Sequence, residues 1–223
     1  MRKFILSTLV SLFISACGGG GSSTPAPSFS FTPGIYTGTF TPAGGAADVF
    51  AIIIASNGSW AGVDFEEGAT GTYSGATLTD PSLTATLTAT SSGTYTSNGI
   101  SGTFTLVDAG IYNRPANLSK LAGTWIDTTF TQNTGTMTHT IDGSGNITST
   151  SVSGCASSGT INTIDTTKNE YTISLTVTNC GGFNGVYTGL ALLDDTTITE
   201  DTLVYLADND ILDTFTLSSA IKQ

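Results

Sequence analysis

Residues 171–178 read Tyr171-Thr172-Ile173-Ser174-Leu175-Thr176-Val177-Thr178, with apolar and hydroxyl side chains in alternation. Successive side chains on a β-strand point to opposite faces, so a period of two predicts a strand with one buried face. Residues 83–90 repeat this pattern with Leu, Ala and Thr. No stretch of ten or more residues shows the 3.6-residue period of an amphipathic helix. The sequence therefore predicts an all-β fold of antiparallel strands.

Two cysteines flank the hairpin to which this strand belongs. Cys155 and Cys180 are nearly equidistant from the polar stretch 165–169, where the chain is expected to turn. In an exported protein such a pair is expected to form a disulfide, which contributes about 3 kcal/mol in the loop-entropy description. Because Cys180 falls on the threonine-bearing face, the bridge is expected outside the apolar core. A redox-active pair is the alternative, but the C-x-x-C spacing is absent.

The C-terminal half, residues 122–223, offers eight candidate strands. They are separated by turn residues and lie at about 123–130, 135–142, 146–153, 155–163, 170–179, 185–193, 201–207 and 211–220. Eight antiparallel strands with short connections can close into an up-and-down barrel, which leaves no exposed strand edge. A two-sheet sandwich is the alternative. The half is predicted to be an eight-stranded barrel or sandwich.

The N-terminal half, residues 31–110, is predicted to be a smaller, related β half. Residues 34–40 and 123–130 are similar, and each stretch is followed by a strand, a Gly-containing turn and another strand. This half offers about six strands, which pack beside the C-terminal barrel or form an open barrel. Residues 50–54 are apolar on both faces, which predicts a central strand. Residues 111–121 break the strand rhythm and are predicted to link the halves.

Three tyrosines, Tyr36, Tyr73 and Tyr187, each lie two residues from a glycine on either side. Residues two apart share a face of a strand, so each ring is expected to cover bare glycine backbone, a device that lets a sheet curve into a barrel. A role in ligand or carbohydrate binding is the alternative.

The composition restricts the partners that this chain can have. There are 42 Thr, 25 Ser and 27 Gly, whereas only 10% of residues are charged, with 6 Lys+Arg against 17 Asp+Glu. No basic cluster lies beyond residues 1–3, so the electrostatic footprint of a nucleic-acid-binding protein is absent.

The N-terminus carries an export signal. A basic start, Met1-Arg2-Lys3, precedes a largely apolar run over 4–16, which is too short to span a bilayer and predicts a signal peptide over 1–16. Ile14-Ser15-Ala16-Cys17 resembles the bacterial lipobox. That resemblance implies cleavage before Cys17, a diacylglycerol on its thiol and a fatty acid such as palmitate on its amino group. An ordinary signal peptide is the alternative. The Gly/Ser/Pro-rich residues 17–30 are predicted to be a flexible tether.

The signal also indicates where the protein is located. Without residues 1–16, four basic residues remain against 17 acidic ones, so anionic lipid repels the body and the acyl chains must provide the anchor. In similar lipoproteins Asp after the lipidated Cys favours inner-membrane retention. Gly18 stands here, which implies the outer membrane, with the periplasmic and surface faces both open.

These features together resemble uncharacterised proteobacterial outer-membrane lipoproteins with a Gly-rich tether and a β-barrel-like C-terminal half. The matching stretches are the lipobox, the tether, residues 112–115 and 121–125, and the 154–180 hairpin. The chain is more loosely similar to surface lipoproteins of the transferrin-binding and factor-H-binding kind, through tether and barrel. Gly123-Thr124-Trp125 is similar to the first strand of lipocalin and avidin barrels. The resemblance implies an envelope lipoprotein and no particular activity.

His139, the only histidine, lies between Met137 and Ile141 on the apolar face of a strand. We expect a hydrogen-bonded histidine in the core or lumen, and contact with a ligand or a general-base role is the alternative. Together with Trp125 and Met137 it forms the candidate lining of a small-ligand site. No recognisable nucleophile motif or phosphate-binding loop is present, so no catalytic residue is predicted.

No metal or cofactor is predicted. One histidine and a bridged cysteine pair cannot supply the ligands of a transition-metal site. Adjacent carboxylates at Glu66-Glu67 and Asp194-Asp195 point to opposite faces of a strand, so neither pair forms an acid/base couple. Oxygen ligands for Ca²⁺ could gather at the strand ends, although the spacing fits no EF-hand loop; the candidates are Asp194, Asp195, Asp201, Asp208 and Asp210.

The sequence thus favours a non-enzymatic, lipid-anchored outer-membrane or envelope protein that binds an unidentified partner or has a structural role. The alternative is a carrier of a small apolar molecule in the lumen of the C-terminal barrel. An enzyme is the third hypothesis, and it lacks a catalytic constellation.

Overall fold

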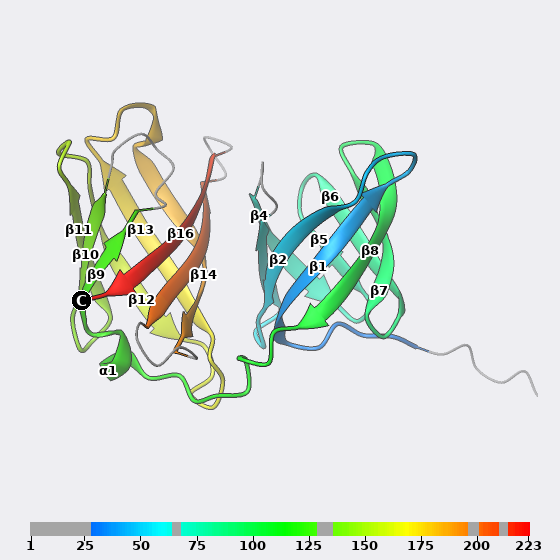
Figure 1. Cartoon of the computed structure of the whole chain (residues 1–223), viewed down its shortest axis with the longest axis horizontal. Helices are drawn as coiled ribbons and strands as arrows, with labels where there is room; N and C mark the ends of the chain where they lie inside the picture. The colour runs from blue at the N-terminus through cyan, green and yellow to red at the C-terminus, as the bar shows by residue number, and fades with distance from the viewer. Residues whose placement is uncertain (1–27, 64–67, 129–135, 196–200, 210–213) are drawn as a thin grey trace, which may run out of the picture.

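The computed structural model describes residues 28–63, 68–128, 136–195, 201–209 and 214–223. The chain forms two closed antiparallel barrels, each of eight strands (Figure 1). The N-terminal barrel consists of β1 (Gly34–Pro42), β2 (Asp48–Ile54), β3 (Ser59–Val63), β4 (Gly68–Ser74), β5 (Thr77–Thr79), β6 (Leu83–Ala89), β7 (Ser92–Ser97) and β8 (Ile100–Asp108). The C-terminal barrel consists of β9 (Gly123–Asp127), β10 (Met137–Ile141), β11 (Asn146–Ser151), β12 (Ala156–Thr163), β13 (Tyr171–Thr178), β14 (Gly185–Asp194), β15 (Thr202–Asn209) and β16 (Thr214–Lys222). Helix α1 (Leu118–Leu121) precedes β9, and the 3₁₀ turn η1 (Gly181–Phe183) follows β13.

The predicted all-β class and the eight-stranded C-terminal barrel are confirmed, with β9 closing against β16. The count of about six strands in the N-terminal half was wrong, because eight are present and β1 pairs with β8 to close the barrel. Strands such as β5 contain only three residues, too few to show an alternating pattern.

The two lumens are filled by different kinds of side chain. In the N-terminal barrel the inward positions carry many aromatic rings, including Trp60, Tyr73 and Phe104. In the C-terminal barrel the inward positions are mainly aliphatic, and the large rings among them are Trp125, Tyr171, Tyr187 and Tyr205. Barrels of eight strands are just wide enough for side chains to fill, so each lumen serves as a hydrophobic core.

Several inward glycines of the N-terminal barrel lie under aromatic rings, which lets the sheet curve. A Cβ at Gly34 would overlap the ring of Tyr36, as expected within one strand. The same expectation was wrong for Tyr73 and Tyr187, because a Cβ at Gly71 would meet Trp60, one at Gly75 would meet nothing and one at Gly189 would meet the backbone of Leu206. In other pairs the ring comes from the neighbouring strand: Phe50 covers Gly38, its partner in the register. Closely packed rings therefore replace the side chains that these strands lack.

Both barrels begin at the same end of the molecule, which we name the proximal end; the opposite end is the distal end (Figure 1). The chain enters the proximal mouth of the N-terminal barrel through Phe31, which is 5% exposed and lies 6.3 Å from Phe104 between ring centroids. The Phe31 amide donates to the carbonyl of Gly75 at 2.7 Å. This anchored segment joins the predicted tether to β1.

The barrels pack side by side through an apolar cluster on their outer faces. Ile53 points out of the N-terminal barrel and is only 2% exposed, whereas Ile52 and Ile54 on the same strand point into its lumen. This explains why residues 50–54 are apolar on both faces. The cluster is formed by Ile35, Ile53, Ala55 and Ala61 from the first barrel, Tyr112 from the linking segment, and Leu190, Leu192 and Leu206 from the second.

A buried carboxylate joins the barrels at the proximal edge of this cluster. Glu170, 0% exposed in the β12–β13 connection, accepts hydrogen bonds from the Ser56 amide at 2.8 Å and from the Ser56 hydroxyl. The Tyr112 hydroxyl also donates to Glu170, at 3.1 Å. Burial and the nearby Glu170 carboxylate raise the pKa of Tyr112, so this phenol stays a donor at physiological pH. Three donors thus satisfy one buried carboxylate across the interface.

Cys155 and Cys180 form a disulfide, with Cα atoms 4.7 Å apart, as their spacing predicted. The expectation that the bridge lies outside the apolar core was wrong, because the two residues are 1% and 8% exposed and belong to the core cluster of the C-terminal barrel. Strand β13 ends at Thr178, and Asn179 has a φ of 58°. This left-handed residue breaks the alternation, so Cys180 turns inward.

Replacing Cys155 and Cys180 together by Ser is expected to lower the free energy of unfolding by about 3 kcal/mol, because the bridge restrains a long loop of the unfolded chain. The measurement is denaturant unfolding of the wild type and the double variant, with each single variant to detect effects of a lone thiol. Equal unfolding midpoints for wild type and double variant would contradict this prediction.

Candidate functional site

The three residues predicted to line a ligand site come together in the lumen of the C-terminal barrel. Trp125 and Met137 are each 0% exposed, and His139 is 3% exposed. Trp125 on β9 is paired with His139 on β10, so their side chains share the inward face. The strand pattern placed His139 on one apolar face with Met137 and Ile141, and Trp125 was predicted beside them as a lining residue.

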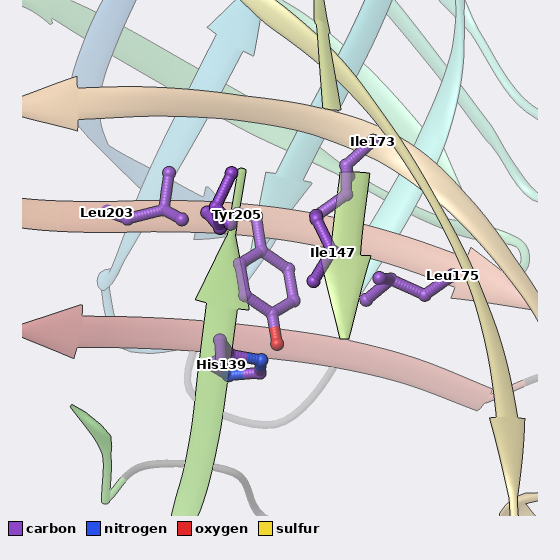
Figure 2. A pocket seen from close by; sticks show the side chains of 7 residues that line it. His139, Ile147, Ile173, Leu175, Leu203 and Tyr205 are labelled. Atoms are coloured by element: carbon purple, nitrogen blue, oxygen red, sulfur yellow. The ribbon is translucent and has the colours of Figure 1, made fainter. Parts of the chain in front are cut away.

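His139 is held from both sides of its ring. Its Nδ1 hydrogen-bonds with the Ser149 hydroxyl at 2.7 Å, and its Nε2 lies 3.6 Å from Oδ2 of Asp127. Tyr205 packs edge-on against the imidazole, with ring centroids 5.9 Å apart. Figure 2 shows the Tyr205 ring pointing toward His139, with Ile147, Ile173, Leu175 and Leu203 around them. The expected hydrogen-bonded histidine is therefore present in the lumen.

Sequence reasoning missed the polar neighbours of His139. Asp127 and Ser149 are 0% and 3% exposed, and Ser157 on the next strand is 6% exposed. The register supplies the missing signal: Asp127 lies two residues after the inward Trp125, and Ser149 is directly opposite His139. Ser149 is in turn opposite Ser157. Once Trp125 and His139 are placed inward, the period of two places these neighbours inward as well.

The order of groups, Ser149, His139 and Asp127, is that of a nucleophile, a base and an orienting carboxylate. Geometry alone does not make this an active site, since all three side chains are almost fully buried. The seven residues that surround the gap beside His139 leave no room for a water molecule. Among the described residues, the Ser149 hydroxyl is therefore shielded from solvent in this arrangement.

Trp125 closes the proximal end of the same lumen. Its indole Nε1 donates to the carbonyl of Leu121, the last residue of α1, at 2.7 Å. The ammonium of Lys222 lies 5.4 Å from the indole ring centroid and also donates to the carbonyl of Lys120. The short helix and the last strand therefore seal this mouth around the tryptophan.

The described acidic residues considered as Ca²⁺ ligands are split between the two ends of the C-terminal barrel, with Asp194, Asp195 and Asp201 at the proximal end and Asp208 near the distal end. Asp194 is opposite Thr202 at the proximal end, whereas Asp208, near the other end of β15, is opposite Thr188. Asp195 accepts from Lys120 at 2.6 Å and also pairs with Arg114, and these contacts lower the pKa of Asp195. Asp210 and Glu66-Glu67 lie outside the described residues. Within the described ranges no group of three or more His, Cys, Asp or Glu side chains could hold a metal ion.

The three glycine-flanked tyrosines serve in packing. The Tyr36 hydroxyl donates to the carbonyl of Thr32 at 2.9 Å, that of Tyr73 to Ala55 at 2.9 Å, and that of Tyr187 to Phe183 at 3.1 Å. Each hydroxyl thus fastens a connecting segment at the end of its barrel.

Comparison of the chain with protein-family models, with curated proteins and with solved structures found no match. In the ranges that the structure describes, no helix is both long enough and apolar enough to cross a bilayer.

Proposed function

We propose that the chain is a lipid-anchored envelope protein of the outer membrane that acts without catalysis, through the outer surface of a rigid pair of barrels. The observation that carries this proposal is the close packing of the described part of the C-terminal lumen: Trp125 and Met137 are fully buried, and no space for a water molecule remains beside His139. A partner of this barrel would then bind its outer wall or its loops. The packed lumen equally disfavours a carrier that holds an apolar molecule there.

The outer wall suits such a role. Exposed hydroxyl residues follow one another across neighbouring strands, as in the row Thr84, Thr96 and Ser101 of β6, β7 and β8. The hydroxyls are hydrogen-bonded in places, for example Thr39 with Thr105 at 2.9 Å and Thr96 with Ser101 at 3.0 Å. A wall of this kind is soluble without charge, in keeping with a charged fraction of 10%.

The anchor is supported by the lipobox-like Ile14-Ser15-Ala16-Cys17 and by the position of the tether. Phe31 fixes the start of the folded body at the proximal end. Residues 18–27 reach at most about 35 Å when fully extended, so the tether would hold the proximal end within that distance of the bilayer.

Replacing Cys17 by Ser is expected to move the protein from the membrane fraction to the soluble fraction, or to leave the signal peptide uncleaved, because the acyl acceptor is lost. Fractionation and the intact mass of the native protein measure both outcomes. The matched control is the Cys155→Ser, Cys180→Ser double variant, which should stay membrane-bound. A membrane-bound mature protein with an unmodified Cys17 thiol would overturn the anchor.

Replacing His139 by Gln is expected to lower the free energy of unfolding by roughly 1–2 kcal/mol. The Gln amide can keep the hydrogen bond to Ser149, but it loses the edge contact with the Tyr205 ring. We expect no ester, glycan or peptide turnover by either protein. Turnover by the wild type that falls at least about 100-fold in His139→Gln at unchanged stability would replace this proposal with an enzyme; that loss is the size expected for a general base.

A further inference from the structure

The distal mouth of the N-terminal barrel holds a cluster of three aromatic rings. Phe40 lies between the other two, with its ring centroid 6.4 Å from that of Phe50 and 6.0 Å from that of Tyr95. Phe40 is at the distal end of β1, and Phe50 is near the start of β2. All three rings are only partly buried, unlike the fully packed rings deeper in the barrel. Aromatic surface is therefore open to solvent at this mouth.

A carboxylate lies on the same face as these rings. Asp48 is directly opposite Phe40 in the register of β1 and β2, and it precedes Phe50 by two residues. Residues paired across two strands have their side chains on the same face of the sheet, and so do residues two apart on one strand. Paired residues have Cβ atoms about 5 Å apart. Since Phe40 and Phe50 face the lumen, Asp48 projects into the mouth beside them. Its Oδ1 accepts from the neighbouring Val49 amide at 2.7 Å.

The charge on Asp48 has no basic counterpart in its own barrel. Residues 34–108 contain no Lys, Arg or His in their sequence. The four basic residues outside the predicted signal peptide are Arg114, Lys120, Lys168 and Lys222, which belong to the linking segment, α1, the β12–β13 connection and the end of β16. All of these places are at the proximal end. The distal mouth thus combines aromatic faces with a carboxylate that, in the part of the chain described, no basic side chain neutralises.

Aromatic faces and a carboxylate together are the chemistry that recognises an organic cation. The electron-rich face of an aromatic ring attracts an ammonium group, more strongly where water is excluded. We propose that Phe40, Phe50, Tyr95 and Asp48 bind the ammonium group of an organic cation at the distal mouth. This inference rests on the proposed non-catalytic binding role and names its ligand class. The ammonium could belong to a free choline-like molecule or to a lysine side chain of a peptide.

The test is a ligand-observed saturation-transfer NMR titration of the purified full-length chain in detergent. The probes are choline chloride, N-acetyl-lysine methylamide, and the neutral isostere of choline in which carbon replaces the ammonium nitrogen. We expect saturable binding of the first, the second or both, and at least roughly tenfold weaker binding of the isostere, as loss of a cation–π contact and a charge partner would give. The probe that binds more tightly identifies the source of the ammonium.

Variants locate the site. Asp48→Asn keeps the size of the side chain and is expected to weaken cation binding roughly tenfold, as loss of a charge partner would. Phe40→Leu should weaken it too, whereas Tyr95→Phe, which keeps the ring, should retain it. The matched control is Asp80→Asn, a second distal carboxylate whose Oδ1 accepts from the Ser82 and Leu83 amides. If the folded Asp48→Asn and Asp80→Asn proteins bind equally well, or if neither cation shows saturable binding, the proposal is wrong.

The proposed anchor and the proposed cation site are tested independently of each other. The Cys17→Ser variant should bind the cation like the wild type, and Asp48→Asn should remain in the membrane fraction. A wild-type protein that is attached to the membrane but binds neither cation would reject the ligand class and leave the anchor standing.

Discussion

Replacing Ile53 by Asp is expected to lower the free energy of unfolding by about 4 kcal/mol and to uncouple the two barrels. Ile53 is 2% exposed and packs in the interface cluster with Leu190, Leu192 and Leu206 of the other barrel. A carboxylate there loses its hydration and meets only apolar side chains. The lumen of the N-terminal barrel should survive, because the Ile53 side chain points away from it.

The two tryptophans make the uncoupling measurable. Trp60 lies in the first lumen and Trp125 in the second, and the chain contains no others. With Trp60→Phe or Trp125→Phe in the background, fluorescence during denaturation reports one barrel at a time. Within each background, we expect the fluorescence transition to coincide with the circular-dichroism transition of the whole chain when Ile53 is retained, and the two to separate in the Ile53→Asp protein.

The control for this prediction is Val107→Asp. Val107 also points outward from the N-terminal barrel, on β8, but it is 62% exposed. A carboxylate at an exposed position should change stability by no more than about 0.5 kcal/mol. Equal losses for Ile53→Asp and Val107→Asp would show that the interface does not contribute to stability in solution.

Replacing Trp125 by Ala is expected to lower the free energy of unfolding by about 4 kcal/mol, within the range for a large aromatic side chain in a core. The indole is 0% exposed, and its loss leaves a cavity and removes the donor to the Leu121 carbonyl. Chemical denaturation of the C-terminal barrel, followed by circular dichroism, measures the loss.

Two further variants separate the contributions of Trp125. Trp125→Phe keeps a ring and removes the N–H donor, so it should cost roughly 1–2 kcal/mol. Thr124→Ala changes the exposed neighbour on the same strand and should have almost no effect. A loss below about 1 kcal/mol for Trp125→Ala would mean that the site collapses around the missing ring, contrary to a rigidly packed lumen.

How much of the fold was predictable depended on strand length. All eight predicted C-terminal strands overlap observed ones, because segments such as β13 are long enough to show the alternation. In the N-terminal half, β5 has only three residues, too few to show the alternation. Closure of that barrel depends on the pairing of β1 with β8, a contact between distant residues that no local pattern reveals.

The candidate site was likewise only partly predictable from the sequence. The period of two placed Met137 and His139 on one apolar face, and Trp125 was predicted as a further residue lining the same lumen. Asp127 and Ser149 are brought to His139 only by the register of β9 and β11 with β10. The cation site at the distal mouth likewise depends on the pairing of Asp48 with Phe40, which a single strand does not show.

The sequence by itself determined the strand class, the inward face of each long strand and the pairing of Cys155 with Cys180, because these follow from alternation and turn chemistry within short stretches. The tertiary structure decided three other features. Asn179, with its φ of 58°, turned Cys180 into the core. The outer faces of β2 and β14 became an interface, since Ile53 and Leu190 are covered only when the barrels meet. Glu170 became buried because donors from Ser56 and Tyr112, distant in sequence, converge on it. Each of these depends on long-range contacts, and the free energy of such contacts is absent from any local pattern.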